Sequence, residues 1–454
     1  MLLLLSSLPA FAAVVPVADV PSLRQAVADA RPGDTLLLAA GVHRLEAPVD
    51  LLASGTATAP IVLAGADGGG TTLEVDAVEG LRVSGAHWAI ERLDIVGVCA
   101  ADDACEHAIH AAGDADGLRI EDCSLRDFNA QLKSNGLEGR FPDDVVIRGN
   151  RFSNRAPRQT ARPVVPIDVV GGDGWRVEAN EIRDFAKAGG DQVSYAAFLK
   201  GNGRNGRFER NLVVCEDTHS GHVRLGLSLG GGGTSPDSVC QAGDCSVEHT
   251  GGVIENNIIV DCPADVGIYL NAARDTQVRF NLLWNTTGID ARFDQTEATL
   301  SGNVSDGPVR ERDGGVALLG DDWIDADGIE SVYADPASGR FHVVDADALA
   351  TEDDDVPGVD FCGRRRTAPA VIGPVAVGST CDTWTTHPSD STGDAAPDTV
   401  AVPMPAQDGP ARGRDRSPDA GSLLACAAGG GRAAPPLLLL LPTLCVLIAR
   451  ARRS

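Results

Sequence analysis

One six-residue pattern, apolar-x-x-Asn-x-apolar, recurs along the middle of the chain and constrains its fold more than any other feature. The copies are IRGNRF (147–152), VEANEI (177–182), FERNLV (208–213), IENNII (254–259), VRFNLL (278–283) and LSGNVS (300–305). Two earlier copies, IERLDI (90–95) and IEDCSL (120–125), carry Leu93 and Cys123 at the asparagine position. Internal repeats with a period of about 20–50 residues are typical of solenoid proteins.

The repeated position is occupied by Leu93, Cys123, Asn150, Asn180, Asn211, Asn257, Asn281 and Asn303, at intervals of 30, 27, 30, 31, 46, 24 and 22 residues. Short β segments with this period predict one coil of a parallel β-helix per repeat. An asparagine at an inward turn can hydrogen-bond the asparagines of the coils above and below it. We therefore predict that these asparagines form a structural ladder. Leucine-rich repeats share the period, but this chain lacks their leucine framework.

These features predict an all-β fold, a single-stranded parallel β-helix over residues 14–385. VPSLRQAVADA (20–30) has helical periodicity, with Pro21 and Ser22 near its start, and predicts a helix that caps the open first coil. At the far end, ADPASGRFHVV (334–344) and VDFCGRRR (359–366) are expected to form a closing β element.

A second, shorter strand is expected before each copy of the motif. These strands are AIH (108–110), QLK (131–133), IDV (167–169), FLK (198–200), LSL (227–229), IYL (268–270) and IDA (289–291). Alternation along a strand directs the apolar members inward and the others outward. One outward row then contains His110, Gln131, Asp168, Phe198, Ser228, Tyr269 and Asp290. A neighbouring row contains Lys133, Lys200, Gly230, Asn271 and Arg292.

Both ends of the chain have the composition of targeting segments. Residues 1–13 have an apolar core followed by small residues, as a signal peptide requires; a buried first strand is the alternative. Residues 386–425 are rich in Pro, Asp and Ala and predict a disordered linker. In residues 426–454 a cysteine precedes an apolar stretch and an arginine cluster, which resembles the C-terminal sorting signals of myxobacterial surface proteins. The alternative is a simple membrane anchor. We expect an exported body, at the cell surface or extracellular, with membrane contact through the tail only.

The chain is acidic, with 38 Lys and Arg residues against 64 Asp and Glu residues, and its body holds no basic cluster. This charge balance argues against nucleic acid as a partner, and we expect a monomer. Two of the eleven cysteines belong to the tail. In an exported chain the others predict disulfides. Cys99–Cys105, Cys240–Cys245 and Cys362–Cys381 are close enough to close local loops, although the sequence leaves the connectivity open. Zinc is less favoured, because no pair has zinc-site spacing.

The N-terminal segments RPGDTLLLAAGVHRL, SGTATAPIVLAGADGG and LRVSGAHWAIERLDI resemble secreted right-handed parallel β-helix proteins, which implies a right-handed, pectate-lyase-like solenoid. The family they are most similar to is the chondroitinase B and alginate lyase family, polysaccharide lyase family 6. The resemblance implies β-elimination on uronate-containing polysaccharides. It also implies a calcium ion that neutralises the uronate carboxylate, a lysine base and an arginine beside the leaving oxygen.

Lys200, in FLKGNGRNGRFERN, looks like the lysine of that family, because a Gly/Asn turn and the next ladder asparagine follow it. The acidic calcium ligands that the family has seven and five residues earlier are replaced by Val193 and Tyr195. Gly230 stands where the arginine of the family is expected, and Arg224 lies close enough in sequence to substitute for it. Ca²⁺ is therefore implied by the resemblance alone, and the chain's own residues predict no certain cofactor.

These observations predict a protein that binds acidic polysaccharide, with cleavage by β-elimination left open. The catalytic candidates are Lys200 and Arg224, and the substrate-binding candidates are Lys133, Asp168, His222, Tyr269, Asn271 and Arg292. His222 belongs to a loop, 215–233, rich in His, Asp and Glu, for which a metal site and an ordinary polar loop are both open. A non-catalytic adhesin is the main alternative function. A glycoside hydrolase is less favoured, because its paired carboxylates would be Asp168 and Asp290, several coils of about 5 Å apart.

Overall fold

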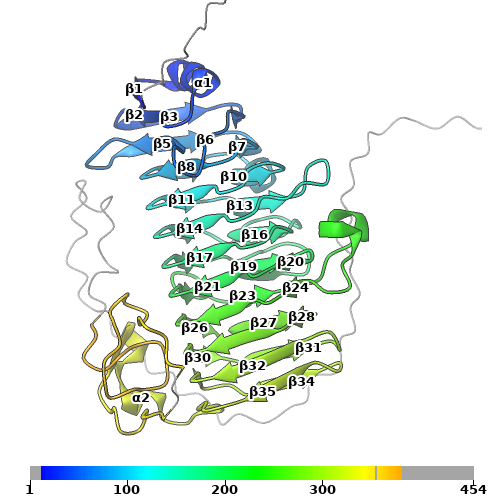
Figure 1. The fold of residues 1–454 in the computed structure, drawn as a ribbon, viewed down its shortest axis with the longest axis vertical. Helices are drawn as coiled ribbons and strands as arrows, with labels where there is room; N and C mark the ends of the chain where they lie inside the picture. Colours follow the sequence, from blue (N-terminus) through cyan, green and yellow to red (C-terminus); the bar gives the residue numbers. More distant parts are fainter. Residues whose placement is uncertain (1–11, 353–354, 381–454) are drawn as a thin grey trace, which may run out of the picture. The chain divides into compact units, whose positions relative to one another are not determined.

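The structure is a computed structural model that describes residues 12–352 and 355–380. Three parallel sheets run along a stack of coils, and each complete coil contributes one strand to each sheet (Figure 1). Consecutive coils pair in parallel along all three sheets, which is the hydrogen-bonding pattern of a solenoid. The predicted fold class, a parallel β-helix, is confirmed.

The sheets are numbered here in the order in which a coil visits them. Sheet 1 contains β1 (Val14–Val17), β2 (Thr35–Leu38), β5 (Ile61–Gly65), β8 (Trp88–Glu91), β11 (Arg119–Glu121), β14 (Val146–Arg148), β17 (Arg176–Glu178), β21 (Arg207–Glu209), β25 (Val253–Glu255), β29 (Thr276–Arg279), β32 (Glu297–Ser301) and β35 (Val316–Leu319). Sheet 2 contains β3 (Gly41–Leu45), β6 (Thr71–Val75), β9 (Asp94–Gly97), β12 (Ser124–Arg126), β15 (Arg151–Ser153), β18 (Glu181–Arg183), β22 (Leu212–Val214), β26 (Ile258–Cys262), β30 (Leu282–Thr286) and β33 (Val304–Ser305). Sheet 3 contains β4 (Val49–Leu51), β7 (Glu79–Val83), β10 (His107–Ala112), β13 (Ala130–Asn135), β16 (Ile167–Val170), β19 (Val193–Lys200), β23 (Val223–Leu229), β27 (Ile268–Asn271), β31 (Ile289–Arg292) and β34 (Val309–Arg312).

Inward-facing side chains of the three sheets form one apolar core. In sheet 3, Ile109, Leu132 and Ile167 stand in register on adjacent strands and are fully buried. Each such aliphatic side chain stabilises the fold by about 1.5–3 kcal/mol relative to its exposed state. Because every coil covers the apolar side chains of its neighbour, the core is continuous along the stack.

The predicted asparagine ladder lies at the turn from sheet 1 to sheet 2. Asn211 Oδ1 accepts from the backbone N and the Nδ2 of Asn180, at 3.1 and 3.0 Å. Asn211 Nδ2 donates to Asn257 Oδ1 at 2.9 Å and to Val177 O at 2.8 Å. The same bonds link Asn150, Asn180, Asn211, Asn257, Asn281 and Asn303, all of them buried. The ladder ends on Asp322, whose carboxylate accepts from Asn303 at 2.8 Å. This terminal acceptor is absent from the predicted repeat.

A helix covers the first coil, as predicted. Helix α1 spans Val20–Asp29, and its N-cap is Asp19, which exchanges hydrogen bonds with Ser22 in a capping box. Leu23 and Val27 are buried against the apolar core. The helix therefore shields the apolar side chains that the first coil would otherwise leave open.

The predicted closing element at the far end is also present. Helix α2 (Ile329–Val332) leads into an antiparallel pair formed by β36 (Tyr333–Asp335) and β37 (Arg340–Val343). Val359 and Arg365 form a further antiparallel bridge. Tyr333 is fully buried in a second apolar cluster.

Three disulfides are present among the described residues. Two of them, Cys99–Cys105 and Cys240–Cys245, close the predicted local loops. The third, Cys215–Cys262, joins two consecutive coils across a sequence separation of 47 residues, a pairing that the sequence left open. Cys362 is also disulfide-bonded, and its predicted partner, Cys381, lies outside the described residues.

Most of the predicted signal peptide, and the whole of the predicted linker and anchor, also lie outside the described residues. Within the parts of the chain that are described, no helix has the length and apolar character needed to cross a membrane.

Candidate functional site

Loop lengths distinguish sheet 3 from the rest of the solenoid. From β8 to the end of the ladder, every turn from sheet 1 to sheet 2 consists of two residues, such as 122–123 and 210–211. Long loops instead enter sheet 3, at 154–166, 184–192 and 215–222. Another long loop, 230–248, leaves it after β23 and contains the short helices η2 (Asp237–Val239) and η3 (Gln241–Gly243), drawn in green in Figure 1. Insertions therefore border both edges of sheet 3, and binding sites commonly use such loops.

The strand register of sheet 3 corrects one predicted row. Lys133 pairs with His110 on one side and with Asp168 on the other, so it belongs to the first outward row and not to the row of Lys200. Gln131 stands two residues earlier, where it is buried and donates to Asn154 Oδ1 at 3.0 Å. The assignment failed because β13 is six residues long and its apolar pattern allows both alignments.

The outward residues of the early coils are paired with one another. Lys133 Nζ contacts Asp168 Oδ1 at 2.7 Å. One strand earlier, His110 Nδ1 contacts Glu79 Oε1 at 2.6 Å, and its Nε2 contacts Asn135 Oδ1 at 2.8 Å. The hydrogen bond from His110 holds the pKa of Glu79 below its usual value. The charges of Lys133 and Asp168 thus compensate each other in the first outward row.

On the middle coils, the outward side chains of sheet 3 include three aromatic rings. The Tyr195 and Phe198 rings on β19 meet edge to face, with centroids 5.6 Å apart. The Tyr269 ring on β27 lies 6.5 Å from that of Tyr195. Lys200 Nζ lies 4.6 Å from the Phe198 centroid, a cation–π distance. Arg292 on β31 reaches the Tyr269 hydroxyl at 3.5 Å. This group is called the aromatic patch below.

The residues around Lys200 do not fit a calcium ion. Val193 and Tyr195 pack against Leu225, Val266 and Tyr269, an apolar environment. Burial there raises the pKa of the Tyr195 hydroxyl, which keeps that oxygen uncharged. Calcium requires six to eight oxygen ligands, chiefly carboxylates and carbonyls. The described residues contain no group of three or more His, Cys, Asp or Glu side chains that could hold a metal. We therefore derive no step through calcium.

Arg224 and His222 lie away from Lys200. Arg224 pairs with Ser194, six residues along β19 from Lys200, or about 20 Å of extended strand. The Arg224 guanidinium is buried and donates to the carbonyl oxygens of Cys215, His219 and Gly221. It thus holds loop 215–222 to β23, and no substrate contact follows from this geometry. His222 belongs to the same loop, and its buried Nδ1 has no hydrogen-bond partner among the described residues.

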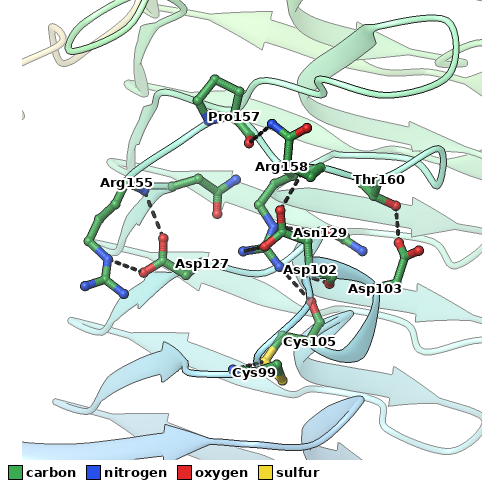
Figure 2. Close-up of polar contacts among 12 residues, drawn as sticks. Cys99, Asp102, Asp103, Cys105, Asp127, Asn129, Arg155, Pro157, Arg158 and Thr160 are labelled. Atoms are coloured by element: carbon green, nitrogen blue, oxygen red, sulfur yellow. Dashed lines mark hydrogen bonds and ion pairs between the residues drawn. A yellow bond between two sulfur atoms is a disulfide. The ribbon is translucent and has the colours of Figure 1, made fainter.

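Neighbouring loops at the entry edge of sheet 3 are joined by a buried arginine. Figure 2 shows Arg158, from loop 154–166, beside Asp102, Asn129 and Cys105. Arg158 contacts the Asp102 carboxylate at 3.0 Å, and it donates to Asn129 Oδ1 and Cys105 O at 3.1 and 3.3 Å. The disulfide Cys99–Cys105 closes the loop that carries Asp102. Through these contacts, loop 154–166 is held against loop 98–106, which lies two coils earlier.

Sequence reasoning missed two residues that organise the site. Glu248 is buried and accepts from Gly201 N and Thr234 Oγ1, at 2.8 and 2.7 Å. Tyr195 was considered only as a substituted calcium ligand, although it completes the aromatic patch. A glutamate in a long polar loop carries no sequence signal, whereas the spacing Tyr-x-x-Phe on one strand is a weak signal for stacked rings.

The three parallel sheets define the chain as a parallel β-helix, a fold that it shares with the solved pectate lyase described below. Residues 17–170 match the family model of chondroitinase B, so the predicted resemblance is confirmed over the early coils. Lys200 lies beyond the matched segment. No curated protein matches the chain.

Solved structures resemble the chain in fold. The crystal structure of pectate lyase Pel9A has 12% sequence identity, covers 81% of this chain and 97% of its own, and superimposes with a TM-score of 0.55. The alginate lyase from Paenibacillus sp. str. FPU-7 has 16% identity, covers 70% of this chain and 96% of its own, and has a TM-score of 0.40. At these identities the likeness concerns the fold alone.

Proposed function

We propose that this protein binds acidic, uronate-containing polysaccharide on the outward face of sheet 3, centred on the aromatic patch, without calcium. The observation that carries the proposal is the juxtaposition of Tyr195, Phe198 and Tyr269 with Lys200 and Arg292, on a sheet that insertions border at both edges. Aromatic rings are the surfaces against which pyranose rings pack, and here a sugar reaches the buried Phe198 and Tyr269 only when the groups that cover them are displaced. Lys200 and Arg292 are the cations that uronate carboxylates prefer, and Arg292 is also paired with Asp313 at 2.5 Å. Aromatic rings beside two cations match an acidic polysaccharide better than a neutral one.

The direction of the sheet suits a polymer. Tyr195 and Phe198 lie on β19, Tyr269 on β27 and Arg292 on β31, so the contacts are spread along the stack. Successive strands are about 4.8 Å apart, a spacing comparable to one sugar unit. A polysaccharide that lies along the stack therefore meets a new strand at about every sugar unit.

Binding is favoured over cleavage by the surroundings of Lys200. β-Elimination needs a base and a second group that neutralises the uronate carboxylate. Gly230 and Asn271 occupy the same outward row on the next two strands, and Arg292 follows only on the third, about 14 Å away. No second cation thus stands next to Lys200 in this row. Cleavage with Lys200 as the base is the second candidate function. It is supported by the resemblance of the segment around Lys200 to the segment that carries the lysine of the lyase family.

The first experiment measures binding of the purified full-length protein to alginate, pectate, chondroitin sulfate and dermatan sulfate by calorimetry, with dextran as the neutral control. We expect binding to at least one polyuronate that survives EDTA and weakens with salt. Absorbance of unsaturated uronate products is followed in parallel. Product formation that Lys200→Ala abolishes would establish the lyase instead. The absence of binding to all four polymers contradicts the proposal.

We also propose that the protein is exported. Three disulfides among the described residues support this, because such bonds persist in oxidising compartments. Cell fractionation with an antibody to the β-helix tests it, and a purely cytoplasmic signal is the contradicting result.

A glycoside hydrolase finds less support. Asp168 and Asp290 stand four strands apart in the outward row, and each is held by a basic partner, Lys133 and Arg312 respectively. That separation is about 19 Å, twice the distance that an inverting pair uses.

A further inference from the structure

The central outward residues of sheet 3 are covered although they point away from the core. Phe198, Ser228 and Asn271 are 4%, 0% and 5% exposed. An outward side chain on a solenoid sheet normally faces solvent, so another part of the chain must lie over it. The segment that does so is Gly231–Gly233, which directly follows β23.

The glycine segment rests on the aromatic patch. A Cβ atom added at Gly231 would lie 3.0 Å from the Phe198 ring and 3.3 Å from Cδ of Lys200. One added at Gly232 would lie 3.4 Å from the Tyr195 hydroxyl. Glycine is therefore required for the backbone to approach the ring this closely, and Gly231 also has a φ of 51°, which favours glycine.

The polar groups beneath the segment bind its backbone. Lys200 Nζ donates to Gly233 O at 3.0 Å, and Asn271 Nδ2 donates to Gly231 O at 2.8 Å. The Ser228 hydroxyl accepts from Gly231 N at 3.0 Å. An ammonium group, an amide donor and a hydroxyl thus surround an aromatic ring, and all of them are engaged by peptide groups that carry no side chain.

The segment lies between two anchored residues. Gly230 N donates to Leu199 O at 2.8 Å, which anchors the start of the loop. Thr234 is anchored by the buried Glu248 carboxylate, which accepts from its hydroxyl at 2.7 Å. Between these anchors, displacement of Gly231–Gly233 breaks a few hydrogen bonds and requires no side chain to repack.

We infer that the space occupied by Gly231–Gly233 is a concealed binding subsite for one uronate unit, and that polysaccharide binding displaces the segment. The pyranose ring replaces the glycine backbone on Phe198, and its carboxylate replaces Gly233 O on Lys200. Sugar hydroxyls replace the Gly231 peptide group at Asn271 and Ser228. This inference rests on the proposed function, since it names one subsite of the same face.

Hydrogen exchange gives the first test. The Gly231 amide donates to the Ser228 hydroxyl and the Gly233 amide to Gly230 O, so these two amides exchange slowly while the segment is closed. Mass spectrometry follows the peptide that spans residues 230–234 with and without saturating alginate or pectate oligosaccharides. We expect faster exchange of these amides in the complex. Slower or unchanged exchange with oligosaccharide bound overturns the inference.

A pair of glycine substitutions gives the second test. Gly231→Ala places a methyl group against the Phe198 ring and drives the segment open, so the cost of opening is removed and affinity rises by about 3–10-fold. The matched control is Gly243→Ala in the same loop. Gly243 also has a positive φ, 67°, but nothing lies within 4 Å of the added atom. We expect the control to bind like the unaltered protein. Equal or weaker binding by Gly231→Ala contradicts the subsite.

Two further variants separate the subsite from the proposed function. In the Gly231→Ala background, Lys200→Met keeps the stem over Phe198 but removes the charge, and it should weaken binding by about tenfold or more. Phe198→Leu should weaken it as well. If the unaltered protein binds polyuronate and both variants weaken binding, but Gly231→Ala binds no more tightly than the unaltered protein, only the concealed subsite is wrong. If neither the unaltered protein nor Gly231→Ala binds any polyuronate, the proposed function and the subsite fail together.

Discussion

The turn between sheets 1 and 2 and the outward face of sheet 3 are built from the same coils, but the first repeats its residues from coil to coil and the second does not. At the turn, successive coils repeat a two-residue connection and the same asparagine, whose side-chain groups are all bonded to the next coil or the previous one. On sheet 3, the residue at one outward position changes from His110 to Lys133, Asp168 and Phe198 over four coils. The comparison teaches that the repeat carries the fold, while departures from the repeat carry chemistry.

The strongest test of this comparison is an asparagine-to-alanine substitution made once in each region. Asn211→Ala removes four side-chain hydrogen bonds and leaves buried partners unsatisfied, so we expect the free energy of unfolding to fall by about 4 kcal/mol. Asn271→Ala removes the bond to Gly231 O and should cost about 1 kcal/mol. Urea denaturation followed by circular dichroism measures both. Equal losses would contradict the distinction between ladder and face.

The disulfides give the next contrast. Cys215–Cys262 joins two coils across 47 residues, and Cys99–Cys105 closes a separation of only 6. Replacing both cysteines of the first pair by alanine should lower the free energy of unfolding by about 4 kcal/mol, at most. The same change in the second pair should cost about 2 kcal/mol, because a shorter loop constrains the unfolded chain less. Thermal unfolding compares the two double variants, and a larger loss for the short loop would contradict the chain-entropy argument.

The loop contacts at the entry edge of sheet 3 should matter locally. Arg158→Met removes the buried contacts to Asp102, Asn129 and Cys105, at an expected cost of about 2 kcal/mol. Arg155→Met is the control, because this side chain is 71% exposed and the buried Asp127 carboxylate that it contacts still accepts from the Arg155 backbone N at 2.9 Å. Limited proteolysis should cut loops 98–106 and 154–166 faster in Arg158→Met only. Faster cleavage in both variants would show that burial is not the deciding difference.

The smallest expected effect concerns pH. His249, which follows loop 230–248, is fully buried and accepts from Gly206 N at 3.1 Å, and burial lowers its pKa to about 3. In the unfolded chain the histidine pKa is about 6.5. Below a pH of about 6.5 the unfolded chain binds a proton at this histidine, whereas the folded protein does not. This residue therefore lowers the free energy of unfolding as the pH falls from about 6.5 towards 3.

A variant that lacks only this histidine isolates its contribution. His249→Gln keeps a hydrogen-bond acceptor but does not titrate. Between pH 6 and pH 5 the unaltered protein should lose about 1 kcal/mol more of its free energy of unfolding than the variant does. Parallel urea curves at the two pH values measure the difference. An identical change in both proteins would show that His249 is protonated in the folded state.

The repeat could be predicted from the sequence because its signal is local. Each ladder asparagine is flanked by apolar residues at fixed positions, and the same six-residue pattern returns in every coil. The capping helix had a similar advantage, since Asp19, Pro21 and Ser22 mark its start. The last partner of the ladder, Asp322, could not be found in this way because its carboxylate stands outside the motif.

The outward face could be predicted only in part. Lys200, Tyr269, Asn271 and Arg292 were placed on sheet 3 because strands alternate with a period of two. Lys133 was assigned to the wrong row, since a shift of two residues leaves the inward and outward pattern of β13 unchanged. The role of Arg224 as a support for loop 215–222 depends on three carbonyl groups whose positions no local pattern specifies.

The sequence by itself thus determined the solenoid, its period, its asparagine ladder and the chemical kinds of residue on its outward rows. Periodic burial of apolar side chains leaves few other ways to satisfy the backbone of such a chain. Only the tertiary structure decided which outward groups meet one another and which are covered. Those contacts join Lys200 to Gly233 and Arg158 to Asp102, across 33 and 56 residues, and they depend on how loops fold back onto sheet 3. Loop positions follow from packing between coils, which no short stretch of sequence contains.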